Sequence, residues 1–146
     1  MRVAFTLHDI GKPAVIQEGD KNRQHEFTEP IIRRTMNQLR YTDQERELVI
    51  AMVAGYPIGE CITAGIIEED VEDIKKKASR INVSAEQFLK LLTIFYKSDA
   101  GSYTVDAGGT QALDDLFDFD REGHQVQLKE QYQQIIDDLR SAVLTN

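Results

Sequence analysis

The sequence has little cysteine and proline and no tryptophan: one Cys, three Pro and no Trp among 146 residues. The single cysteine, Cys61, excludes an intrachain disulfide and any cysteine-based metal cluster. Such a composition suits a reducing cytosol. The chain also lacks a run of about 18 apolar residues, and its first residues become polar too soon for a signal peptide. We therefore expect a cytoplasmic protein that does not use a membrane.

Positive charge is also scarce. The chain has 17 basic and 25 acidic residues, a formal net charge of −8. A field of that sign repels phosphate backbones and argues against a broad nucleic-acid surface. A small pocket for one phosphate is still allowed, because a metal ion inverts the local potential. Hydrophobic residues at 41% and this length suffice for the core of one globular domain, 1–146.

Alternation at period two, the pattern of a half-buried strand, is missing, and helical periodicity dominates instead. Apolar stripes at helical spacing fall on Ile32, Met36 and Leu39; on Phe88, Leu92, Phe95 and Tyr96; around Leu113, Leu116 and Phe117; and on Leu128, Tyr132, Ile135, Leu139 and Val143. Residues 66–81 hold a further helix, with acids early and bases late, an order that complements the helix dipole. The patterns predict an all-α fold.

Two polar residues predict where helices begin. Thr42 with Glu45 forms a capping box, and Ser84 has the position of an N-cap. Glycine and proline predict loops at 10–25, 55–65 and 100–111.

The candidate chemistry begins at His8 and Asp9, which offer an imidazole nitrogen and a carboxylate to a divalent cation. Leu7 before them and Gly11 after them indicate a helix that ends there, which presents both side chains to one cleft. Lys12 adds a compact positive charge suited to a phosphate oxygen. The alternative is a packed or capping histidine beside a solvated acid, since the dipeptide is common.

The longer stretch Leu-His-Asp-Ile-Gly-Lys-Pro, residues 7–13, resembles the signature of the HD phosphohydrolase superfamily. Gln24-His25-Glu26 stands where many members carry Gly-His-Glu, and Met52-Val53 where members have a Leu-Val step. Residues 95–100 resemble the last motif, a helix that closes on an aspartate ligand. The pattern is similar to the HD domains attached to tRNA nucleotidyltransferases. The resemblance implies an HD-like helical bundle over 1–110, with a C-terminal helical extension over 111–146.

The resemblance also implies roles for individual residues. His8, Asp9 and Asp99 would ligate a divalent metal (Mn, Fe, Ni, Co, Zn or Mg), whose water attacks phosphorus. Asp9, Lys12 and His25 would serve catalysis, with Lys12 holding the phosphate. His25 would ligate a second metal or donate a hydrogen bond to the substrate or leaving group. The alternatives are a loop histidine that faces water and a helix-end acid at Asp99 with no partner.

The chain departs from the family pattern in two places. The first histidine of the family lies on a helix well before the His-Asp pair, whereas only seven residues precede His8. The resemblance thus implies a bundle that lacks its first helix, in a truncated or split protein or one with a misassigned start codon. Tyr56 stands near the point where members with a second metal carry a histidine. A lost helix would leave an apolar groove, so we expect a homodimer or the final helix to fill it.

Two functions remain open. One is a metal-dependent phosphomonoesterase or phosphodiesterase that acts on a nucleotide-like or other small phosphate. The other is a degenerate, non-catalytic HD module for ligand binding, regulation or assembly. Gly55-Tyr56-Pro57 spells the tail of the HD-GYP signature but lies too close to the His-Asp pair, so we interpret it as coincidence. His124 is expected in a surface loop, and Cys61 in a small buried apolar role.

Overall fold

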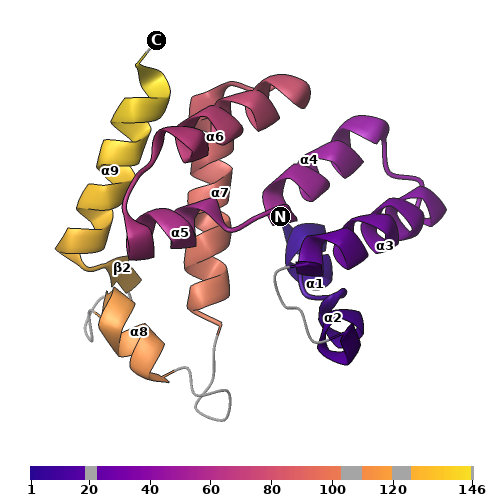
Figure 1. The fold of residues 1–146 in the computed structure, drawn as a ribbon, viewed down its shortest axis with the longest axis horizontal. Coiled ribbons are helices and arrows are strands. Elements are labelled where there is room, and N and C mark those ends of the chain that lie inside the picture. The colour runs from indigo at the N-terminus through magenta and orange to yellow at the C-terminus, as the bar shows by residue number, and fades with distance from the viewer. Residues whose placement is uncertain (19–22, 103–109, 120–125, 146) are drawn as a thin grey trace. The chain divides into compact units, whose positions relative to one another are not determined.

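A computed structural model of the chain describes residues 1–18, 23–102, 110–119 and 126–145. Within these ranges the protein is all-α apart from one small hairpin, as predicted (Figure 1). The helices are α1 (Arg2–Leu7), α2 (Lys12–Glu18), α3 (Gln24–Gln38), α4 (Asp43–Val53), α5 (Pro57–Ala64), α6 (Glu68–Arg80), α7 (Ala85–Ala100), α8 (Thr110–Leu116) and α9 (Glu130–Leu144). The strands are β1 (Phe117–Phe119) and β2 (Val126–Leu128), which pair antiparallel.

The chain divides into two compact units. Unit 1 comprises Met1–Tyr56 with Arg80–Asn82, and unit 2 comprises Pro57–Ser79 with Val83–Asn146. The predicted organisation, one HD-like domain with a core over 1–110 and an extension over 111–146, stays a prediction. Each unit is described by itself.

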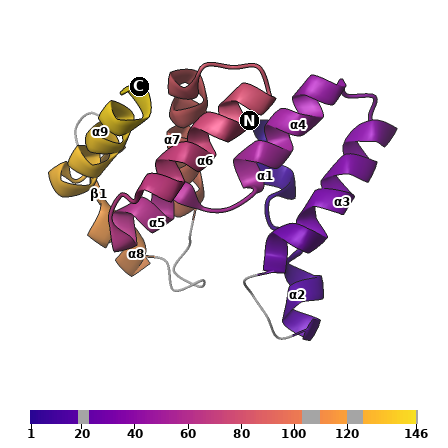
Figure 2. The ribbon, with the colours of Figure 1, turned by 45° about the horizontal axis from the view of Figure 1, so that its top comes forward.

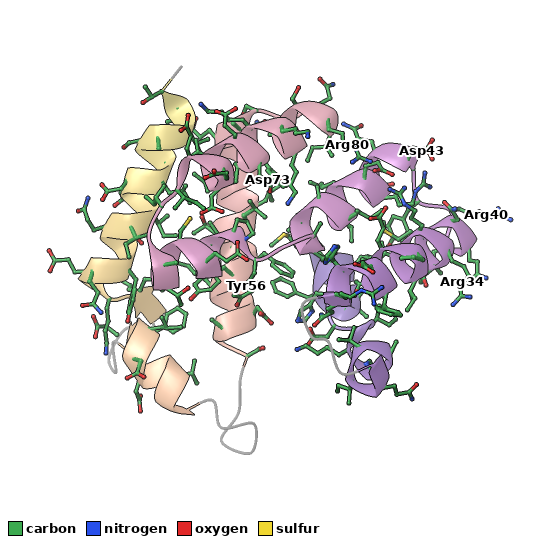
Figure 3. The ribbon with its side chains drawn as sticks, viewed as in Figure 1. Arg34, Arg40, Asp43, Tyr56, Asp73 and Arg80 are labelled. Atoms are coloured by element: carbon green, nitrogen blue, oxygen red, sulfur yellow. The ribbon has the colours of Figure 1, made fainter. Side chains whose placement is uncertain are left out.

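In unit 1, α3 packs on α2 and α4, and α1 packs on α4 (Figure 2). The core is formed by small and aliphatic side chains, among them Ala4, Leu7, Val15, Ile32, Met36 and Met52. The capping box predicted at Thr42 is confirmed: its hydroxyl accepts from the Glu45 backbone N–H, and the Glu45 carboxylate accepts from the Thr42 N–H. The box starts α4 shortly after Arg40, which has a φ of +61° and whose side chain lies at the edge of the unit (Figure 3).

In unit 2, α9 packs against α5 and α7, and α5 packs against α7. Phe88, Leu92 and Phe95 of α7 are buried, so the predicted stripe of α7 faces a core. In α9 the predicted Leu139 and Val143 are buried, but the third buried residue is Ile136 where Ile135 was predicted. Ser84 is the N-cap of α7, in a capping box with Gln87. The final helix therefore has its packing surface within unit 2. That it also fills a groove beside His8 stays a prediction.

Three local predictions were wrong. The predicted loop 10–25 contains α2, and the predicted loop 55–65 contains α5. Phe117 and Leu128 were assigned to helices, but they lie opposite each other in the β1–β2 ladder. In the third predicted loop, α7 ends at Ala100 and α8 begins at Thr110, and residues 103–109 lie outside the described ranges. His124 also lies outside them.

One helical stretch, Asp43–Ala64, is long and apolar enough to cross a membrane by length and composition alone. Core helices of soluble proteins pass the same test, so this is weak evidence. The stretch also contains a break at Gly55, where φ is +89° between α4 and α5. The cytoplasmic localisation stays a prediction.

Candidate functional site

The His-Asp pair follows directly on the end of α1. The helix stops at Leu7, and His8 is its C-cap, with its backbone N–H donating to the carbonyl of Ala4. The chain then turns and re-enters helix at Lys12, whose backbone N–H donates to the carbonyl of Asp9 at 3.0 Å. This turn confirms the prediction that a helix ends beside the pair. It also places Lys12 one turn from Asp9, close enough for their side chains to meet.

The His8 ring has a defined orientation. Its Nδ1 lies 2.7 Å from the carbonyl oxygen of Phe5, which can only accept, so Nδ1 carries the proton in this bond. In the neutral ring, Nε2 then holds the lone pair, and it lies 3.4 Å from Asp9 Oδ2. A ring N–H donated to a backbone carbonyl is how proteins orient metal-ligating histidines.

The Asp9 carboxylate is bound on both oxygens. Lys12 Nζ donates to Oδ2 at 2.6 Å, and Gln24 Nε2 donates to Oδ1 at 3.3 Å. The same Gln24 nitrogen lies 3.1 Å from the backbone carbonyl oxygen of His8. The Asp9 and Lys12 side chains are both partly open to solvent, at 42% and 45% exposure. Sequence reasoning missed Gln24, which it placed only as the neighbour of His25.

Gly11 explains how Gln24 reaches the turn. A Cβ at Gly11 would lie 2.4 Å from Thr28 Oγ1 and 2.9 Å from the backbone oxygen of Gln24. Only glycine therefore allows the turn to lie this close to α3. Thr28 Oγ1 is buried, and it has no hydrogen-bond partner in the described part of the chain. In the sequence, only Gly11 indicated that another element could pack closely against this turn.

The other two predicted residues are His25 in unit 1 and Asp99 in unit 2. His25 is exposed on the first turn of α3, and within the described ranges no hydrogen bond joins it to His8, Asp9 or Lys12. Asp99 lies near the end of α7 in unit 2 and is buried, at 6% exposure. A carboxylate at that depth needs a polar or charged partner. The convergence of Asp99 with His8 stays a prediction.

The surroundings of Asp99 can be described within unit 2. The Ser102 hydroxyl donates to the Asp99 backbone carbonyl at 2.7 Å and so closes the end of α7. One turn earlier, Tyr96 is buried, and its pKa is raised by that burial, with Tyr132 and Asp99 adding to the effect. Asp99 thus belongs to a buried, partly aromatic region next to α9.

Among the residues that the structure describes, no group of three or more His, Cys, Asp or Glu side chains has the spacing to hold a metal ion. The local pair does offer two donor atoms of suitable chemistry. Two ligands bound at roughly 2.0–2.1 Å to one tetrahedral cation lie about 3.4 Å apart. That is the separation of His8 Nε2 and Asp9 Oδ2. The pair therefore fits two positions of a metal site.

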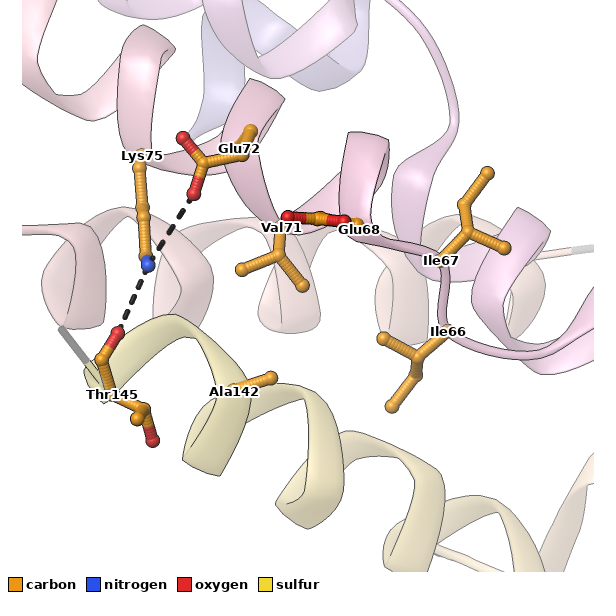
Figure 4. Close-up of a pocket in the computed structure, with 8 residues that line it drawn as sticks. All are labelled: Ile66, Ile67, Glu68, Val71, Glu72, Lys75, Ala142 and Thr145. Atoms are coloured by element: carbon orange, nitrogen blue, oxygen red, sulfur yellow. Dashed lines mark hydrogen bonds and ion pairs between the residues drawn. The ribbon is translucent and has the colours of Figure 1, made fainter.

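A separate open hollow of about 430 Å³ lies in unit 2, between the start of α6 and the end of α9 (Figure 4). It is lined by Ile66, Ile67, Glu68, Val71, Glu72, Lys75, Ala142 and Thr145. Lys75 Nζ donates to the backbone oxygen of Thr145 at 3.0 Å and lies 3.5 Å from Glu72 Oε1. None of the predicted site residues lines this hollow.

Comparisons of the chain with protein-family models, with curated proteins and with solved structures gave no match. The HD assignment therefore enters below as a proposal. What supports it is the motif in the sequence together with the geometry of residues 8–12 and Gln24.

Proposed function

We propose that this protein is a metal-dependent phosphohydrolase of the HD type, acting on a nucleotide-like or other small phosphate ester. The observation that carries the proposal is the pairing of His8 Nε2 with Asp9 Oδ2 at 3.4 Å. Two adjacent residues supply a nitrogen and an oxygen donor at the spacing of ligands on one cation. The Phe5 carbonyl fixes the His8 ring in this orientation.

The chain's own residues have distinct roles in this proposal. His8 and Asp9 would hold a divalent cation, and Asp99 is proposed as its third ligand. When bound, such a cation would supply Lewis acidity and would make a water molecule a stronger nucleophile towards phosphorus. Lys12 binds a phosphate oxygen with its ammonium group, which suits a compact anion. His25 donates a hydrogen bond to the substrate or leaving group.

A second candidate is a non-catalytic HD module that binds a ligand or serves regulation or assembly. It is favoured by the ion pair between Lys12 Nζ and Asp9 Oδ2 at 2.6 Å, which places an ammonium on the carboxylate that a metal needs. It is also favoured by the lack of a three-residue metal group within the described ranges. Metal uptake without hydrolysis separates this candidate from the enzyme.

The test uses protein purified without a chelating tag. Metal content is measured after incubation with excess manganese, iron, nickel or zinc, for wild type, His8→Ala, Asp9→Asn and Asp99→Asn. Asp73→Asn serves as the control, because Asp73 is a partly exposed acid of α6 paired with Lys77 (Figure 3). Hydrolysis of p-nitrophenyl phosphate and bis(p-nitrophenyl) phosphate is measured on the same samples.

We expect weak metal binding in wild type and in Asp73→Asn, and its loss in the three site variants. Hydrolysis that follows metal content supports the enzyme. Metal binding without hydrolysis supports the non-catalytic module. If wild type takes up none of the four metals, the enzyme proposal fails. If His8→Ala and Asp99→Asn bind as well as wild type, the site assignment is wrong.

A further inference from the structure

The Asp9 carboxylate already has a cation in contact with it. The ammonium of Lys12 lies 2.6 Å from Oδ2, the same oxygen that lies 3.4 Å from His8 Nε2. A divalent metal shared by His8 and Asp9 and the ammonium of Lys12 therefore compete for one oxygen. The other oxygen, Oδ1, accepts from the neutral amide of Gln24 at 3.3 Å. This amide brings no charge to the site and does not repel a metal.

We propose that Lys12 is an exchangeable cation that holds Asp9 until a divalent metal displaces it, and that Gln24 is the positioning residue that keeps the carboxylate in place during the exchange. The inference rests on the proposed function, because it assumes that His8 and Asp9 ligate a metal. The inference gives Lys12 a role before substrate binds, as the cation that occupies Asp9. It also gives a positioning role to Gln24, which the sequence motif did not identify.

The strength of the ion pair is suited to exchange. Both side chains are more than a third exposed, so water and salt screen this ion pair and keep it weak. Lysine also carries its charge on a flexible four-carbon stem, so the ammonium moves without disturbing the backbone. Displacement by a metal would release the ammonium towards a phosphate oxygen. Metal binding and phosphate binding then favour each other, as linkage requires.

The position of Gln24 is fixed by packing. Gly11 lies so close to α3 that an added Cβ would overlap Thr28 Oγ1 and the Gln24 backbone oxygen. From this first turn of α3, the Gln24 amide bridges the His8 carbonyl and Asp9 Oδ1. These two contacts join the His8 backbone and the Asp9 side chain to α3 without using the Lys12 ammonium. Asp9 therefore keeps its orientation when the ammonium leaves.

The experiment is a titration of the metal-free protein with Co²⁺, whose visible absorbance depends on its ligands, with calorimetry for affinity. The variants are Lys12→Met, Gln24→Ala and the double variant. Lys77→Met is the matched control, because Lys77 Nζ forms an equally short ion pair, 2.6 Å from Asp73 Oδ2, on α6. Both lysine variants remove one positive charge and break an ion pair with an aspartate, but only Lys12 contacts Asp9.

We expect Lys12→Met to bind Co²⁺ roughly three- to fivefold more tightly than wild type, the ratio that removal of an exposed ion pair allows. The gain should shrink as salt is raised, because the competing ion pair is screened. Lys77→Met should bind as wild type does. Gln24→Ala should weaken binding and alter the Co²⁺ spectrum, also in the Lys12→Met background, while the unfolding midpoint stays within the range of the control.

The other outcomes overturn the exchange role of Lys12, the positioning role of Gln24 or the proposed function. If wild type binds Co²⁺ but Lys12→Met binds equally or more weakly, the exchange role is wrong and the proposed function stands. If Lys12→Met binds and wild type does not, Lys12 blocks the site instead of exchanging, so the exchange role is wrong and the proposed function fails for the natural sequence. If neither binds, both fail. If Gln24→Ala leaves affinity and spectrum unchanged, or only lowers stability, Gln24 is not a positioning residue.

Discussion

Among single residues, Gly11 is the one whose replacement should affect both folding and the candidate site. An added methyl group at Gly11 would lie 2.4–2.9 Å from atoms of Thr28 and Gln24, two of them backbone atoms that cannot swing aside. Overpacking of this kind costs typically about 1–3 kcal/mol. We expect Gly11→Ala to lower the free energy of unfolding by about that amount in urea titrations, and to weaken Co²⁺ binding because the turn moves away from Gln24.

Gly65→Ala is the control for this prediction. Gly65 has a φ of +88°, so alanine is strained there, but no atom lies within 4 Å of the added Cβ. It should lower stability and leave Co²⁺ binding unchanged. A Gly11→Ala variant as stable as wild type would show that the close approach of the turn to α3 is not real.

Cys61 is the second residue with a specific expectation. Its side chain is fully buried, and the thiol donates to Asp70 Oδ2 at 3.6 Å. Burial, with the Asp70 charge adding to it, raises the pKa of Cys61 to about 12. Because the thiolate is the reactive form, we expect native protein to resist a thiol reagent such as DTNB near neutral pH and to react once unfolded. Rapid reaction of the folded protein would contradict the burial.

The same shift predicts a loss of stability in alkali. Above the ordinary pKa of 9.0 the unfolded thiol loses its proton, while the folded thiol keeps it up to about 12. The unfolded state is therefore favoured progressively across this window. Relative to Cys61→Ala, wild type should lose stability between these two pH values, as measured by urea unfolding. A constant difference would refute the shift.

At the scale of elements, substitutions in the two capping boxes measure how much each box stabilises its helix, α4 or α7. Thr42 caps α4 in unit 1, and Ser84 caps α7 in unit 2, each accepting a backbone N–H three residues on. We expect Thr42→Ala and Ser84→Ala each to cost about 1 kcal/mol of stability, the usual value of an N-cap. Thr42→Ser and Ser84→Thr, which keep the hydroxyl, should cost much less. Equal effects of alanine and hydroxyl replacements would mean that the caps do not contribute.

At the scale of the whole molecule, unit 1 is discontinuous in sequence. It includes Arg80–Asn82, which follow Met1–Tyr56 only after part of unit 2. Glu47 of α4 accepts from Arg33 of α3 and, at 3.3 Å, from Arg80 at the end of α6. The Arg33 hydrogen bond, then the charges of Arg33, Arg80 and Arg46, hold the pKa of Glu47 below its ordinary value. Glu47 thus contributes stability that is present at neutral pH and is lost as the pH falls through the lowered pKa.

Glu47→Gln tests this arrangement. We expect wild type to be more stable than the variant at neutral pH, and the difference to vanish as the pH drops below the ordinary value of 4.5. Thermal unfolding of both proteins between neutral pH and about pH 3 measures it. Glu47 is partly exposed, so added salt should reduce the difference. A difference that persists unchanged in acid would show that Glu47 acts through packing alone.

The sequence by itself determined most of the helical architecture. The capping box at Thr42 and the N-cap at Ser84 predicted two helix starts, and the order of acids and bases predicted α6. These rules depend only on neighbours within one turn. It also predicted that a helix ends beside His8, where α1 stops at Leu7. The contact between Asp9 and Lys12 is also local, because the two residues are three positions apart in the chain.

Only the tertiary structure decided the rest. α2 and α5 were mistaken for loops because each is short and opens with a proline in its first turn, which reads as a turn until its apolar side is buried. The pairing of Phe117 with Leu128 required a partner strand that periodicity within one segment does not reveal. Gln24 reaches Asp9 across 15 residues only because Gly11 packs against α3. Contacts of that kind arise from the packing of one element on another, which no local pattern specifies.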